Sequence, residues 1–228
     1  MIRALVFDFD GTILDTETPA YLTLKEIYQE YGVELPLDEW CKCIGTRGGE
    51  FDPLGYLESC VGRPLDKKAI HQRWRARHQK MVEQQRPLPG VERLLQEAKA
   101  KGLKVGLASS SDREVILHRL TMLDLLSHFD CVCTADDVEY VKPDPALYLL
   151  AISRLGVRPE EAVAVEDSPN GALAAKRAGL RCLVVPNPMT AGLNLGEYEL
   201  RLDSLEELTV DSLLDGSAFS VSVKGERR

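Results

Sequence analysis

The fold of this chain is decided by the stretch Ile2-Arg3-Ala4-Leu5-Val6-Phe7-Asp8-Phe9-Asp10-Gly11-Thr12. Its first part is an apolar run broken only by Arg3, which is typical of a strand buried on both faces of a parallel sheet. Two carboxylates, Asp8 and Asp10, follow at the mouth of that strand. Like charges so close together repel each other, and partial desolvation adds to the cost. A divalent cation would remove this conflict, so the stretch predicts a strand that ends in a metal-dependent acidic site.

Length and composition are those of an ordinary globular protein. The chain has 228 residues, 44% of them hydrophobic and 28% charged, which suffices for one large domain or for a core domain with an insertion. A formal net charge of −8 argues against nucleic acid or an anionic membrane as the main partner. The N-terminus lacks the basic and apolar segments of a leader, and no run is long enough to span a bilayer. We therefore expect a cytoplasmic protein and, since no apolar stripe is left unaccounted for, a monomer.

The six cysteines do not form a recognisable metal site. Zinc sites usually combine C-x₂₋₄-C pairs with further Cys or His ligands. Here the two close pairs are C-x-C, namely Cys41 with Cys43 and Cys131 with Cys133. We expect reduced thiols that pack as small hydrophobic side chains.

Short apolar runs alternate with longer amphipathic ones, which is the pattern of a parallel sheet covered by helices. The expected strands are Arg3–Asp8, Lys104–Ala108, Asp130–Cys133, Glu161–Val165 and Arg181–Val185. The expected helices between them are Val91–Lys101, Arg113–Met122, Pro145–Leu155 and Asn170–Ala178. The sequence therefore predicts an α/β fold with a doubly wound, Rossmann-like parallel sheet.

Residues 15–86 break this alternation, because they show one helical pattern after another and no strand. The first helix is expected to begin at Thr18-Pro19, with Thr18 as its N-cap, and to run to Gly32. We predict an all-helical cap domain, residues 15–86, inserted into a core domain that consists of residues 1–14 and 87–228.

A second long helix of the insertion is expected over Asp66–Gln85. His71 and His78 lie among basic residues on this helix, and a solvated amphipathic face explains them better than a ligand site. The residues from Gly216 onward are small and polar with a basic end, so we expect them to be frayed or to form a short appended strand.

Four motifs together resemble the haloacid dehalogenase-like superfamily in their order along the chain. They are Asp8-Phe9-Asp10-Gly11-Thr12, Ser109 after a strand, Lys142-Pro143, and Glu166-Asp167. Each is expected at the carboxyl end of a strand, which is where open α/β sheets place their sites. The helical insertion resembles the subgroup with a helical cap, which includes β-phosphoglucomutase and many sugar-phosphate phosphatases.

The resemblance implies catalytic roles for Asp8, Asp10 and Lys142. Asp8 would attack phosphorus and form an aspartyl-phosphate. Asp10 would protonate the leaving alkoxide and then deprotonate the water that hydrolyses the intermediate. Lys142 would contact the phosphate and balance the charge on Asp8 and the transferring group.

The resemblance also implies how the phosphate and a Mg²⁺ ion would be held. The expected phosphate ligands are the backbone N–H groups of Gly11 and Thr12, the hydroxyl of Ser109, and Lys142. The expected metal ligands are Asp8, Asp10 through its backbone carbonyl, Glu166 and Asp167. Two of these residues have a simpler alternative, since Glu166-Asp167 could cap the helix that begins near Pro169. For Ser111, in Ser111-Asp112-Arg113-Glu114, a helix cap is the better interpretation.

In this subgroup the cap supplies substrate contacts, and we expect them from the loop Ile44-Gly45-Thr46-Arg47-Gly48-Gly49. Arg47 would bind a second anionic or hydroxyl-rich part of the substrate, although an exposed turn arginine explains it equally well. β-Phosphoglucomutases usually carry a histidine on the first cap helix and a lysine before the loop glycine. This chain has Ala20 and Ile44 at those places, so the cations that would hold a distal phosphate are missing. Their loss favours hydrolysis.

The preferred hypothesis is therefore a Mg²⁺-dependent phosphomonoester hydrolase that acts through an aspartyl-phosphate on a small metabolite, such as a sugar or polyol phosphate. The main alternative is a sugar-phosphate mutase of the β-phosphoglucomutase type. A phospho-acceptor resembling response-regulator receivers would use a similar set of side chains, but receivers lack an insertion such as residues 15–86. Halide release is disfavoured, because the family's dehalogenases generally lack the second aspartate of the first motif, here Asp10.

Overall fold

The computed structural model describes residues 1–41, 44 and 51–220 of the chain. Its core is one sheet of six parallel strands in the order β3-β2-β1-β4-β5-β6. The strands are β1 (Ala4–Phe7), β2 (Lys104–Ala108), β3 (Cys131–Cys133), β4 (Ala162–Glu166), β5 (Arg181–Val184) and β6 (Leu200–Arg201). The chain proceeds outward from β1 to β3 on one side and from β4 to β6 on the other, so the predicted doubly wound sheet is confirmed.

Strand β1 lies at the centre of this sheet. Its first residue, Ala4, pairs with Lys104 on β2 and with Ala162 on β4, and all four of its residues are buried. This double-sided burial is the reason for the apolar run that precedes the two aspartates. The five expected strands are present, whereas β6 was not predicted, because a strand of two residues offers no periodicity to detect.

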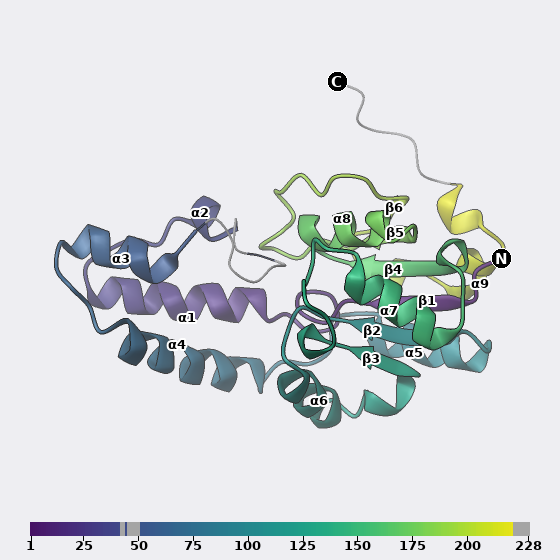
Figure 1. Ribbon diagram of the computed structural model, residues 1–228, viewed down its shortest axis with the longest axis horizontal. Helices are drawn as coiled ribbons and strands as arrows, with labels where there is room; N and C mark the ends of the chain where they lie inside the picture. The colour runs from purple at the N-terminus through teal and green to yellow at the C-terminus, as the bar shows by residue number, and fades with distance from the viewer. Residues whose placement is uncertain (42–43, 45–50, 221–228) are drawn as a thin grey trace, which may run out of the picture.

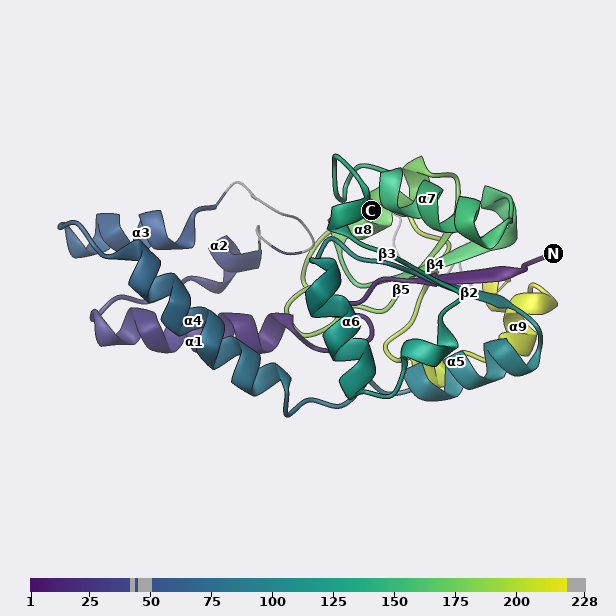
Figure 2. The same cartoon turned by 60° about the horizontal axis from the view of Figure 1, so that its bottom comes forward.

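Helices cover both faces of the sheet (Figure 2). One face packs against α5 (Val91–Ala100), α6 (Arg113–Met122) and α9 (Val210–Leu214), and the other against α7 (Ala146–Leu155) and α8 (Pro169–Arg177). Along β1, Leu5 and Phe7 belong to the first core, whereas Ala4 and Val6 belong to the second. This alternation follows from the two-residue period of a strand. Short 3₁₀ turns lie at Leu126–His128, Ala135–Asp137, Pro159–Glu161, Leu205–Glu207 and Ser217–Phe219.

The expected insertion forms a helical cap to one side of the sheet (Figure 1). Its helices are α1 (Glu17–Glu30), α2 (Leu37–Cys41), α3 (Pro53–Val61) and α4 (Lys67–Val82). They enclose a separate apolar core that includes Tyr28, Trp40 and Ile70. The two connections to the sheet lie side by side, because the N–H of Leu88 donates to the carbonyl of Ile13 at 2.8 Å. The helical nature of the insertion is thus confirmed, and the domain boundaries at residues 14/15 and 86/87 stay a prediction.

Helix α1 begins earlier than expected. The prediction placed Thr18 at the N-cap and Pro19 at the first helical position, but the helix starts at Glu17. The carboxylate of Asp15 accepts a hydrogen bond from the Thr18 N–H at 2.9 Å. An aspartate three residues upstream therefore satisfies the free N–H group, and Thr18 cannot be the cap because it is already inside the first turn.

Within the described ranges, no helix is long and apolar enough to cross a membrane. Of the six cysteines, five are described and are free thiols, and Cys43 lies outside the described residues. The polar segment from Gly216 contains the 3₁₀ turn Ser217–Phe219, so the described part of this segment has neither the frayed nor the stranded form expected of it.

Candidate active site

The carboxyl edge of the sheet brings the four motifs together. Asp8 follows β1, Ser109 follows β2, and Glu166 closes β4 with Asp167 next to it. Lys142 reaches the same place from the loop that precedes α7. All five side chains are buried or nearly so. Parallel strands point their carboxyl ends the same way, so residues far apart in sequence meet at one edge.

Lys142 lies between two carboxylates at this edge. Its Nζ is 2.5 Å from Asp8 Oδ1 and 2.6 Å from Glu166 Oε1, and its side chain is only 2% exposed. Burial alone would lower the pKa of Lys142, but the charges of Asp8 and Glu166 outweigh burial and raise it above its usual value. The ammonium group therefore stays protonated and acts as the counter-charge of the buried acids.

Glu166 is completely buried and is held by several donors. Besides Lys142, the hydroxyl of Tyr148 donates to Glu166 Oε1 at 2.5 Å. Burial, followed by the charge of Glu166, raises the pKa of Tyr148 well above its usual value, so this phenol remains a donor. Helix α8 approaches the carboxylate closely, because a Cβ at Gly171 would lie 1.9 Å from Glu166 Oε2. Sequence reasoning missed Tyr148, which has the pattern of an ordinary aromatic on the buried face of a helix.

The expected helix cap at Glu166-Asp167 is provided by another residue. The N-cap of α8 is Ser168, whose side chain accepts a hydrogen bond from the Gly171 N–H at 3.1 Å. The two acids are therefore not needed to start the helix. They are available for the acidic cluster instead.

Asp8, Glu166 and Asp167 form a cluster that could hold a metal ion. Each offers a carboxylate oxygen, and these oxygens lie within 4.8 Å of one another. Asp167 Oδ2 accepts a hydrogen bond from the Asn187 amide at 2.7 Å, which fixes the orientation of the carboxylate. Sequence reasoning did not single out Asn187, because it lies past β5 in a loop without a motif.

The electrostatics of this cluster fit a divalent cation. Three buried carboxylates face one ammonium group, which leaves the site with excess negative charge. Burial, opposed by the attraction of Lys142 and assisted by the charges of Glu166 and Asp10, raises the pKa of Asp8 to about 8. Burial and the neighbouring acids also raise the pKa of Asp167 well above its usual value. Without a cation the cluster therefore takes up protons, and an all-oxygen site of this kind suits Mg²⁺.

Asp10 points to a different set of partners. Its Oδ1 accepts hydrogen bonds from Thr16 Oγ1 at 2.9 Å and from Arg119 Nη1 at 2.7 Å. Its Oδ2 accepts from Ser111 Oγ at 2.6 Å and from Ser109 Oγ at 3.4 Å. The helix cap predicted for Ser111 is wrong, because Asp112 is the N-cap residue of α6 and the Ser111 hydroxyl binds Asp10 instead.

The residues expected to bind phosphate lie around these acids. The N–H of Gly11 donates to the Leu14 carbonyl at 2.7 Å, and the N–H of Thr12 donates to the Phe9 carbonyl at 3.4 Å. The turn needs glycine at position 11, where φ is +87° and a Cβ would lie 2.3 Å from Asp167 Oδ2. The phosphate-binding roles of Gly11, Thr12 and Ser109 stay predictions, as does the backbone contact of Asp10 to a metal.

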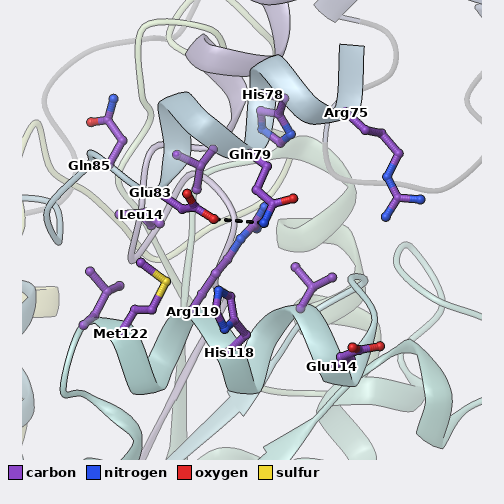
Figure 3. Close-up of a pocket in the computed structure, with 13 residues that line it drawn as sticks. Leu14, Arg75, His78, Gln79, Glu83, Gln85, Glu114, His118, Arg119 and Met122 are labelled. Carbon is purple, nitrogen blue, oxygen red and sulfur yellow. Dashed lines mark hydrogen bonds between the residues drawn. The ribbon is translucent and has the colours of Figure 1, made fainter. Parts of the chain in front are cut away.

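A cavity of about 580 Å³ lies between α4 of the cap and α6 of the core (Figure 3). His78 lines it and contacts the Thr16 carbonyl at 3.0 Å. Burial, together with the nearby charges of Arg119 and Arg75, lowers the pKa of His78. The prediction that His78 lies on a solvated face is therefore wrong. Helical periodicity shows which residues share a face of α4, but not that α6 and the Thr16 carbonyl lie next to that face. The prediction of a solvated face holds for His71, which is exposed.

Two further contacts connect the cap to the catalytic edge. The Asn170 amide donates to the Ile44 carbonyl at 3.2 Å, and the Cys41 thiol donates to the Met189 carbonyl at 3.2 Å. The cap therefore contacts the first turn of α8 and the loop that follows β5. Arg47, the expected substrate ligand of the cap loop, lies outside the described residues.

Glu17, on the first turn of α1, was not predicted to belong to the site. Its side chain is half-buried, and burial, followed by the charges of Asp10 and Asp8, raises its pKa to about 8. The raised pKa favours the protonated form of the carboxyl group, which can donate a hydrogen bond. The sequence shows only an acid in the first turn of a helix, which needs no other explanation.

Comparison with known proteins agrees with this geometry. Residues 5–185 match the family described as haloacid dehalogenase-like hydrolase. The Bacillus subtilis (strain 168) protein YhcW is 50% identical over 215 residues, covering 94% of this chain and 97% of that protein. Hexitol phosphatase B of Escherichia coli (strain K12) is 36% identical over 216 residues, covering 93% and 97%.

A solved structure gives the same fold. CbbY from Rhodobacter sphaeroides, crystallised in complex with xylulose-(1,5)bisphosphate, is 30% identical and has a TM-score of 0.71 against this chain. The similarity covers 91% of this chain and 96% of that chain. The chain therefore belongs to the haloacid dehalogenase-like hydrolases, and within that family it is a phosphatase.

Proposed function

We propose that this chain is a Mg²⁺-dependent phosphatase of sugar or polyol phosphates that acts through an aspartyl-phosphate on Asp8. The observation that carries the proposal is the division of labour between the two aspartates. Asp8 lies in the buried cluster beside Lys142, whereas Asp10 lies apart among hydroxyl groups and Arg119. This difference in surroundings supports attack on phosphorus by Asp8 and proton transfer by Asp10.

The residues expected to hold Mg²⁺ are Asp8, Glu166 and Asp167, with the backbone carbonyl of Asp10. A bound Mg²⁺ ion supplies positive charge that offsets the repulsion between the attacking carboxylate and a phosphate dianion. Lys142 supplies a further positive charge beside Asp8, fixed in advance by Glu166 and therefore free of reorganisation during the reaction.

The chemical steps follow from these positions. A carboxylate oxygen of Asp8 bonds to phosphorus while the bond from phosphorus to the ester oxygen breaks. The proton of Asp10 passes to that oxygen, and the alcohol leaves. Water then attacks phosphorus and gives a proton to Asp10, which releases inorganic phosphate and restores the carboxylate of Asp8.

Relatives support a hydroxylated substrate. One is named hexitol phosphatase B, and another, from Thermotoga maritima, is named phosphorylated carbohydrates phosphatase and is 33% identical over 181 residues. The donor form of Glu17, on the cap side of the two aspartates, is suited to substrate hydroxyl groups.

The mutase alternative is disfavoured by the cap core. Ala20 and Ile44 stand where β-phosphoglucomutases usually have cationic or imidazole side chains. Both are buried among apolar residues, at 8% and 3% exposure, and neither can bind a distal phosphate. We therefore propose hydrolysis and not phosphate transfer between sugar positions.

The test is phosphate release from a panel of sugar and polyol phosphates, with Mg²⁺ and with EDTA. We expect turnover only with Mg²⁺, and loss of all turnover in Asp8→Asn. The matched control is Asp211→Asn, whose carboxylate is 71% exposed and pairs with Lys101 away from the site. Activity in Asp8→Asn equal to that of the control would refute the covalent mechanism. Isomerisation of β-glucose 1-phosphate to the 6-phosphate, faster than phosphate release, would establish the mutase.

A further inference from the structure

Arg119 makes a contact with the acid/base residue that the mechanism above does not use. It lies on α6, and its side chain rises from that helix into the cavity shown in Figure 3. At the end of this side chain, Nη1 donates to Asp10 Oδ1 at 2.7 Å. The two side chains are 15% and 20% exposed, so the pair is shielded from solvent far more than a surface ion pair.

The orientation of the Arg119 guanidinium group toward Asp10 is also restricted. The guanidinium carbon of Arg119 lies 5.9 Å from the ring centre of Phe9, the residue between the two aspartates. Stacking of this kind limits the orientations that the guanidinium group can adopt. The other donors to Asp10 are the hydroxyl groups of Thr16, Ser111 and Ser109, all of which are neutral. Among the described contacts of Asp10, Arg119 is thus the charged one.

We propose that Arg119 is the positioning residue of Asp10, and that it determines where the acid/base proton is delivered. The inference rests on the proposed function, in which Asp10 moves that proton. Arg119 and Thr16 hold Oδ1 of Asp10, so Oδ2, whose partners are serine hydroxyl groups that can donate or accept, is the oxygen left to carry the acid/base proton. Among the described residues, Arg119 forms an ion pair with Asp10 and with none of the three cluster acids, so Asp10 is the reacting group on which it can act directly.

This role predicts a dependence on the leaving group. An alkoxide needs a proton as it departs, whereas 2,4-dinitrophenolate is stable without one. Displacement of Asp10 by about 1 Å can cost about 10²-fold in a step that uses it. Removal of Arg119 should therefore slow the hydrolysis of alkyl phosphates. It should leave the rate of the first step with 2,4-dinitrophenyl phosphate nearly unchanged.

The experiment compares wild type with Arg119→Met, whose side chain retains the apolar stem without the charge. Substrates are 2,4-dinitrophenyl phosphate and the alkyl phosphate that wild type hydrolyses fastest. We expect kcat/KM for the alkyl phosphate to fall about 10- to 100-fold. We expect the pre-steady-state burst of dinitrophenolate to stay within about threefold of wild type, since only general-acid assistance is lost.

Arg158→Met is the control. Arg158 is 71% exposed, and its ion pairs with Glu160 and Glu161 precede β4, at the edge of the sheet opposite the site. Its replacement should leave both substrates unaffected. In the background of Asp10→Asn, Arg119→Met should change the dinitrophenolate burst less than twofold, because its partner carboxylate is gone.

The outcomes separate this inference from the proposed function. If wild type releases no phosphate from any monoester, the proposed function fails. If wild type is active and Arg119→Met slows both substrates equally or neither, the positioning role is refuted. Should Arg119→Met fail to fold, Thr16→Val decides the question, because it removes a second donor to the same oxygen. Thr16→Val should lower kcat/KM for the alkyl phosphate and leave the dinitrophenolate burst nearly unchanged. An equal reduction with both substrates would again refute the positioning role.

Discussion

Replacement of Lys142 by methionine should cost about 3–5 kcal/mol of unfolding free energy at pH 8.5 in EDTA, the cost typical of breaking a buried ion pair. Lys142 is 2% exposed and lies 2.5 Å from Asp8 and 2.6 Å from Glu166. Methionine fills most of its volume but leaves two buried carboxylates facing each other without a counter-charge. For a chain of this length, the loss corresponds to a Tm lower by roughly 6–20 °C.

The penalty should shrink at pH 5.5. Burial raises the pKa of Asp8 to about 8 even with Lys142 present, and loss of the ammonium group moves it further in the same direction. A carboxyl with a raised pKa in the folded state contributes stability that is complete below its unfolded pKa and is lost as the pH rises through the folded pKa. The variant therefore keeps its protons at pH 5.5, and loses part of its stability by pH 8.5.

Urea unfolding at both pH values measures this difference directly. The matched control is Lys99→Met, whose partner Asp130 lies at 2.7 Å but with side-chain exposures of 37% and 26%. We expect less than about 1 kcal/mol for the control at either pH. If Lys142→Met were no worse than the control at pH 8.5, or equally destabilised at both pH values, the charge-compensation argument would be refuted.

Three other predictions follow from the same cluster. Tyr148→Phe removes the donor at 2.5 Å from Glu166 and should lower the unfolding free energy by about 1.5–3 kcal/mol, measured in urea; no loss would mean that Glu166 is satisfied without it. Gly171→Ala places a Cβ 1.9 Å from Glu166 Oε2 and should lower the unfolding free energy by about 1–3 kcal/mol. It should also weaken Mg²⁺ binding measured by calorimetry. The control Gly192→Ala, which has open space around its Cβ, should have neither effect. Mg²⁺ should raise the Tm more at pH 8.5 than at pH 6, because protons compete for Asp8 and Asp167 at the lower pH; an equal rise at both would place the metal elsewhere.

The acidic cluster could be predicted from sequence because a parallel sheet imposes it. Once β1 and β4 are identified as buried strands, their carboxyl ends lie at one edge, and Asp8 and Asp167 lie close together. The sequence could not supply the loop geometry that brings Lys142 to them. That placement came from the resemblance to a family, and Tyr148 and Asn187, which orient the acids, had no motif to mark them.

The partners of Asp10 show where local reasoning stops. Ser111 precedes a helix and has the side chain of a cap, so a prediction based on neighbouring residues assigns its hydroxyl to the backbone. In the folded chain α6 begins after Asp112, and the Ser111 hydroxyl donates instead to the carboxylate of Asp10, 101 residues away. Sequence spacing carries no information on such a distant acceptor.

Arg119 is the harder case, because its own segment gives no reason to bury it. An arginine on an amphipathic helix is normally solvated, and α6 offers it no acid at a spacing of three or four residues toward the N-terminus. It is held inward by Phe9 and Asp10, which come from the turn after a strand more than a hundred residues earlier. A charge in that position is costly unless it is paired. Arg119 pairs with the proton-transfer aspartate and not with an exposed acid. We therefore expect replacement of Arg119 to reduce proton delivery by Asp10 more than it reduces the stability of the fold.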